Sequence, residues 1–189
     1  MASNSQLSVW LKIWYQPRVS TQALIDSGRG HGAALTIAVL FGAVQSLRFY
    51  ISGMQGGGVL VLGGAAGAVG LFLFGWLLRN FGRWFKAEAS VRAVRTVLGI
   101  GLLPWTLVFL GMAGVVASGR GVAGFEWLMF SVFFAVFIYG YVILLLGLST
   151  ALKISVLKTF LCLVVTFLVS LFPLTLLGQI IFGAPGAVP

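Results

Sequence analysis

The chain has 189 residues, of which 60% are hydrophobic and only 8% are charged, with a formal net charge of +9 and a mean hydropathy of +1.09. A soluble domain carries roughly 25% charged residues, which cover its surface. Because the apolar residues also fall in long unbroken runs, the composition excludes a soluble enzyme, a disordered chain, a coiled coil and a secreted disulfide scaffold. We therefore expect an all-α, polytopic membrane protein.

Residues 1–32 precede the first apolar run and carry an amphipathic pattern. Four apolar residues at helical spacing share one stripe of this segment: Leu7, Trp10, Leu11 and Trp14. Pro17 ends the pattern and suits the first turn of a second short helix. Since tryptophan prefers the headgroup region, the pattern predicts an interfacial amphipathic helix with Trp10, Trp14 and Pro17 as contact residues. The segment either anchors the chain on the inner leaflet or offers a docking site for a soluble partner.

Five apolar runs are long enough to cross a hydrocarbon core of roughly 30 Å at about 1.5 Å per helical residue. They cover residues 33–50, 59–78, 97–117, 127–148 and 159–182. These runs predict a five-helix bundle over residues 33–182, followed by a short tail at residues 183–189. The segment before the bundle contains charges and a proline, so it does not have the pattern of a signal peptide, and we expect the first span to be retained.

Lysine and arginine are distributed unevenly between the two sides of the predicted bundle. One side carries ten of them: Lys12, Arg18, Arg29, Arg79, Arg83, Lys86, Arg92, Arg95, Lys153 and Lys158. The other side carries Arg48 and Arg120. The positive-inside rule then predicts an N-terminus in the cytoplasm and a C-terminus outside it. We expect this cytoplasmic charge to contact anionic lipid headgroups or a specific acidic partner, and we expect no nucleic-acid partner.

Residues 79–95, between the second and third spans, are the most charged part of the chain. Arg79, Arg83 and Lys86 have i, i+4, i+7 spacing, so a helix places them on one face. Aromatic residues occupy the adjoining face, and the pattern predicts a basic amphipathic helix at the membrane surface. Two interpretations remain open for these three cations, a lipid-facing surface and a binding site for a partner.

The second span carries a face of small residues that includes Gly63, Gly67 and Gly70. The spacing from Gly63 to Gly67 is typical of helices that pack backbone to backbone within a membrane. Such a face serves either as a contact with another span of the same chain or as the contact between two copies in a homo-oligomer.

Side chains that usually carry catalysis are scarce, with three acids, one histidine and one cysteine in the chain. The GxGxxG spacing from Gly119 to Gly124 lies in a short loop between spans and not in a βαβ unit, so it predicts no dinucleotide site. We expect no catalytic, cofactor-binding or metal-binding residue. Four polar residues are candidates either for a transport path or for hydrogen bonds between helices: Gln45, Arg48, Glu126 and Gln179.

Three stretches of the chain form a recognisable series. They are Ile13-Trp14-Tyr15-Gln16-Pro17-Arg18 before the first span, VRAVRTVLGIGLLPW with Pro104 at the third, and GLSTALKISVLKTF before the fifth. In this order they resemble the Yip-one domain of the YIP (Ypt/Rab-interacting protein) family, and the resemblance extends over nearly the whole chain. The short N-terminal region is similar to that of bacterial inner-membrane members.

The resemblance implies a five-span bundle with a cytoplasmic N-terminus and no catalytic residue. It also implies relatives that act in vesicle trafficking, bind prenylated small GTPases and associate with each other in the membrane. A bacterial cell offers no matching prenylated partner. We therefore expect a non-enzymatic protein of the bacterial inner membrane that organises lipids or partner proteins through its basic cytoplasmic face. The alternative is a transporter or channel for a small molecule, an ion or a lipid.

Overall fold

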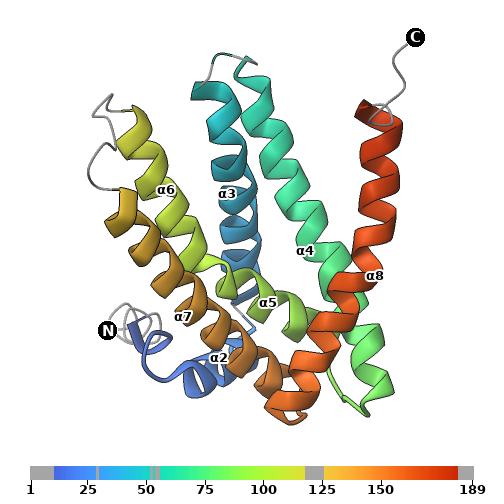
Figure 1. The fold of residues 1–189 in the computed structure, drawn as a ribbon. Helices are drawn as coiled ribbons and strands as arrows, with labels where there is room; N and C mark the ends of the chain where they lie inside the picture. The colour runs from blue at the N-terminus through green and yellow to red at the C-terminus, as the bar shows by residue number, and fades with distance from the viewer. Residues whose placement is uncertain (1–10, 29, 52, 54–55, 118–125, 183–189) are drawn as a thin grey trace.

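The computed structural model describes residues 11–28, 30–51, 53, 56–117 and 126–182, and the regular secondary-structure elements among these residues are all helices (Figure 1). The helices are α2 (Pro17–Asp26), α3 (Gly30–Ile51), α4 (Gly58–Trp84), α5 (Val91–Gly101), α6 (Leu103–Ala117), α7 (Glu126–Leu152) and α8 (Val156–Phe182). Five stretches are long and apolar enough to cross a membrane: Gly30–Ile51, Gly58–Trp84, Val91–Val115, Met129–Leu152 and Val156–Pro173. The prediction of a five-span, all-helical membrane protein is confirmed.

The second span extends further than the sequence predicts. Helix α4 continues through Arg79 and Arg83 to Trp84, about 1.7 turns beyond the predicted end at residue 78. It ends where Lys86 adopts a left-handed φ of 62° and the backbone N–H of Ala87 donates to the carbonyl oxygen of Gly82 at 3.0 Å. The prediction of a separate surface helix over residues 79–95 is wrong, because they divide between the end of α4, a connecting segment and the start of α5.

The third span consists of two helices, α5 and α6, that meet at Leu102. Pro104 lies in the first turn of α6, where its missing N–H costs little, but the same residue cannot continue the hydrogen-bond ladder of α5. The backbone N–H and the hydroxyl of Thr106 both donate to the carbonyl oxygen of Leu102, at 2.9 Å each. Figure 1 shows α5 lying across the lower part of the bundle between α7 and α4, and α6 rising beside α7.

The packed core surrounds α5. Buried residues of α4, α5, α7 and α8 form one cluster: Leu78, Ala93, Val94, Val97, Leu144, Leu148, Ala151, Leu152 and Cys162. A second cluster joins the pre-membrane segment and α2 to α3, α5 and α7 through Ile13, Leu24, Ala34, Ile37, Ile100 and Ile143. Both clusters lie toward the end of the bundle where α2, the α4–α5 link and the α7–α8 turn are found, and α8 diverges from α4 beyond it (Figure 1).

Candidate functional site

One end of the bundle collects most of the positive charge. Nine described lysines and arginines lie on elements at this end: Lys12, Arg18, Arg79, Arg83, Lys86, Arg92, Arg95, Lys153 and Lys158. These elements are the pre-membrane segment with α2, the end of α4 with its link to α5, α5 itself, and the turn between α7 and α8 (Figure 1). We call this end of the molecule the basic end. Its charge has the one-sided distribution that the positive-inside rule requires.

The cations predicted as contact residues differ in exposure. Arg83 and Lys86 are exposed, whereas Arg79 is half-buried and its Nε atom is buried without a hydrogen-bond partner. Trp84 is 72% exposed, and its ring contacts Phe81 edge to face with 4.9 Å between centroids. An exposed tryptophan beside exposed cations is typical of a surface that contacts lipid headgroups.

Of the predicted contact residues in the pre-membrane segment, Trp14 is packed onto α7. The ring of Trp14 stacks on Tyr139, with 6.2 Å between centroids and 12° between planes, and the Tyr139 hydroxyl donates to the Trp14 carbonyl oxygen. Ile13 is not part of the predicted apolar stripe, yet it is buried. Leu11, which is part of that stripe, is 64% exposed. Pro17 begins α2 at the position where a proline is tolerated. The predicted Trp10 falls outside the described residues.

The two groups of predicted contact residues are not brought together. Trp14 and Pro17 belong to the segment that runs beneath α7, and Arg79 and Arg83 belong to the end of α4 on the other side of the basic end (Figure 1). The basic end therefore offers two separate surfaces. The α2 surface contains Trp14 and Pro17, and the α4 surface contains Arg79, Arg83 and Trp84 with Lys86 just after the helix.

The small-residue face of α4 meets α3. A Cβ atom on Gly63 would collide with Ser46 and the carbonyl oxygen of Gly42, and one on Gly67 would collide with the carbonyl oxygen of Ala38. This is close backbone packing between two spans of one chain. Gly70 does not share the contact, because a Cβ atom there would have nothing within 4 Å.

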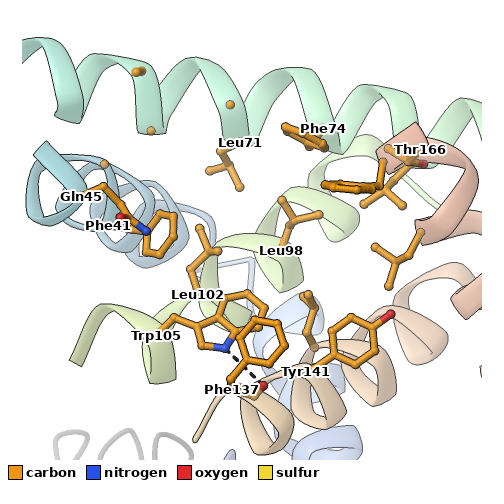
Figure 2. A pocket seen from close by; sticks show the side chains of 18 of the residues that line it. Phe41, Gln45, Leu71, Phe74, Leu98, Leu102, Trp105, Phe137, Tyr141 and Thr166 are labelled. Atoms are coloured by element: carbon orange, nitrogen blue, oxygen red, sulfur yellow. Dashed lines mark hydrogen bonds between the residues drawn. The ribbon is translucent and has the colours of Figure 1, made fainter. Parts of the chain in front are cut away.

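Gly70 borders on a cavity of about 840 Å³ between the helices, which Gly63 and Gly67 also line. Helices α3, α4, α6, α7 and α8 form its walls, and α5 lies at its base (Figure 2). The residues labelled in Figure 2 show its chemistry: Phe41, Gln45, Leu71, Phe74, Leu98, Leu102, Trp105, Phe137, Tyr141 and Thr166. The volume falls in the range of roughly 300–1,000 Å³ that is usual for small-molecule pockets.

The polar groups of the cavity are few and most are already engaged. Trp105 donates from Nε1 to the carbonyl oxygen of Phe137 at 3.4 Å. Ser46 and Thr166 donate to carbonyl oxygens of their own helices, at 3.1 and 2.7 Å. Gln45 is the one predicted path residue that lines the cavity, and the side chains of Arg48, Glu126 and Gln179 lie outside those that the structure describes. The cavity therefore presents a hydrocarbon surface.

The comparison with known families decides what kind of protein this is. A family model of the Yip1 domain matches residues 11–177. The chain belongs to the Yip1 domain family. No curated protein and no solved structure matches the chain. Since the matched residues run from the pre-membrane segment into α8, both the basic end and the cavity are parts of the Yip1 domain.

Proposed function

We propose that this Yip1-domain protein is a non-enzymatic protein of the bacterial inner membrane that organises lipids and partner proteins. Its basic end lies in the cytoplasm and binds anionic headgroups and acidic surfaces. The observation that carries the proposal is the gathering of nine described cations on the elements of one end, beside the exposed Trp84. Each basic residue near an anionic surface contributes about 1 kcal/mol of attraction, so such a group binds strongly even with salt screening.

The α4 surface is the part of the basic end that we expect to bind. Arg83 and Lys86 are exposed there, with Trp84 between them in the sequence. On the α2 surface the aromatic Trp14 is engaged with Tyr139, and the carboxylate of Asp26 accepts a hydrogen bond from Gln22 at 2.8 Å. The α4 surface thus keeps both its charge and its tryptophan available to a ligand.

Crosslinking in native membranes tests this proposal. The variant in which Arg79, Arg83 and Lys86 are each replaced by glutamine should capture on the order of a hundredfold less anionic lipid and partner protein than the parent chain, since three attractions of about 1 kcal/mol each are removed. The control replaces Arg79 and Arg83 by lysine, which keeps the charge, and it should capture nearly as much as the parent. Equal capture by the glutamine variant and the parent chain would refute the role of the α4 surface.

Lipid transport is a second candidate function, and the cavity is the observation that favours it. A charged substrate would lose its hydration there, whereas a lipid chain would gain contact with an apolar lining. A Gly70→Phe substitution fills open space in the cavity. It should slow the movement of a labelled phospholipid between the leaflets of reconstituted vesicles. The matched control is Val61→Phe, on the same helix at a 74% exposed position that does not line the cavity. An unchanged rate in the Gly70→Phe protein would exclude the cavity as the transport path.

A further inference from the structure

A second hollow of about 600 Å³ lies on the opposite face of α4 from the cavity. Six residues line it: Ala68, Val69, Phe72, Leu73, Trp76 and Arg95. The first five are apolar residues of α4, and Arg95 reaches the hollow from α5. We call this hollow the Arg95 groove. It contains one formal charge on an otherwise hydrocarbon surface.

The position of Arg95 depends on a glycine of α4. A Cβ atom on Gly75 would lie 2.5 Å from Cγ of Arg95, so a larger residue at position 75 would obstruct the arginine stem. Beyond Gly75 the guanidinium carbon lies 4.3 Å from the centroid of the Phe72 ring. This is the geometry of a cation–π interaction, which holds the guanidinium against the outer face of α4.

Two side-chain nitrogen atoms that pack on or beside the Phe72 ring of the groove have no hydrogen-bond partner among the described residues. Nε of Arg95 is buried and has no hydrogen-bond partner. His31 packs edge to face against the same Phe72 ring, with 6.3 Å between centroids, and its Nδ1 atom is also buried without a partner. Among the residues that the structure describes, no acidic side chain lines the groove. The half-buried guanidinium of Arg95 is therefore open to an anion from outside the chain, which would pair with its charge.

We propose that the Arg95 groove binds an anionic phospholipid, with its phosphate on Arg95 and one acyl chain along α4. A guanidinium forms charge-assisted hydrogen bonds with phosphate oxygens. The order of polarity along the groove matches that of a phospholipid, because Arg95 and Trp76 lie toward the basic end and Ala68 lies about 12 Å further along α4. The described lining residues include no carboxylate, which disfavours a zwitterionic lipid, because its ammonium group would have no partner among them.

This site rests on the proposed function, because it requires the basic end to lie at the level of the headgroups. It differs from the α4 surface in being a single groove within the bundle wall and not an exposed group of cations. The two can therefore be tested apart.

Site-specific photocrosslinking tests the groove. The full chain is reconstituted in vesicles with equal amounts of phosphatidylglycerol and phosphatidylcholine, and a photoreactive benzoylphenylalanine replaces Leu73 in the groove. We expect adducts with phosphatidylglycerol to exceed those with phosphatidylcholine about fivefold, the preference that one arginine near the headgroups provides. Arg95→Gln should return the ratio to one, and Arg95→Lys should keep part of the preference. The matched control carries the photoreactive residue at Val61, an exposed position on α4 outside the groove, and should show a ratio near one throughout.

Each outcome decides one of the two ideas. A ratio near one at position 73 in the protein with native Arg95 overturns the groove proposal without any arginine variant, so a folding defect of Arg95→Gln does not affect the test. A preference that persists in correctly folded Arg95→Gln overturns it as well. If the preference at position 73 is present but the glutamine variant of Arg79, Arg83 and Lys86 captures as much as the parent, the proposed role of the α4 surface fails and the groove remains.

Discussion

Two glycines on α4, Gly67 and Gly70, lie three residues apart and have opposite surroundings. A Cβ atom on Gly67 would collide with the α3 backbone, whereas one on Gly70 would point into open space. Gly67→Ala should therefore lower the free energy of unfolding in detergent by about 1–3 kcal/mol, the usual cost of overpacking. Gly70→Ala should leave it unchanged or raise it by up to about 1 kcal/mol, since alanine favours a helix. Equal effects of the two substitutions would contradict close packing between α3 and α4.

Lys86 has a backbone conformation that suits glycine better than lysine. Its φ of 62° lies in the left-handed region, which costs an L-residue roughly 1–2 kcal/mol. Lys86→Gly should raise the free energy of unfolding by about 0.5–1 kcal/mol, once the entropy cost of glycine is subtracted. The rise should be measured as a higher melting temperature. Lys86→Ala, which removes the same charge and keeps the strain, is the control. An equal rise in both variants would mean that charge, and not backbone conformation, is responsible.

At the level of elements, Ile13 is one of the buried side chains that hold the pre-membrane segment to the bundle. This side chain is 3% exposed and belongs to the cluster that joins α2, α3 and α7. Ile13→Ala removes buried contacts, typically at a cost of about 2–5 kcal/mol, so it should detach the segment. Hydrogen exchange of residues 11–28 should become faster, with little change in α7. Leu11→Ala, at an exposed position, should have no effect, and equal protection in both variants would show that Ile13 does not hold the segment.

The elements themselves were largely predictable from the sequence. All five spans follow from the apolar runs, because hydrocarbon thickness sets their length. The end of α4 was not predictable, since continuation through Arg79 depends on the left-handed turn at Lys86. Pro104 indicates a break in the third span, but the direction of α5 across the bundle depends on how α5 packs against α3, α4 and α7.

The candidate sites were predictable only in part. The distribution of lysine and arginine predicts that one side of the bundle is basic. The spacing of Gly63 and Gly67 predicts a close contact between helices, but only the structure shows that the second helix is α3. The cavity has no signal in the sequence, since it results from the divergence of helices that are apolar on all sides. In the sequence Arg95 is only one of ten basic residues on one side of the bundle. Its contacts with Gly75 and Phe72 join α5 to α4, so they could not be predicted from the sequence.

Over the whole molecule, packing and charge are concentrated at the same end. The buried clusters around α5 and the nine described cations lie toward the basic end, and the cavity lies where the helices diverge from it (Figures 1 and 2). A firmly packed end suits the presentation of a fixed charged surface, and an open apolar cavity suits contact with lipid chains. The first use requires the basic end to face the cytoplasm.

The orientation of the bundle is thus the central claim, and fusions to a reporter enzyme that is active only outside the cytoplasm measure it directly. A fusion after Ser90, in the link between α4 and α5, should be inactive, and a fusion after Pro189 should be active. Activity after Ser90 together with inactivity after Pro189 would place the basic end outside the cytoplasm and contradict the account.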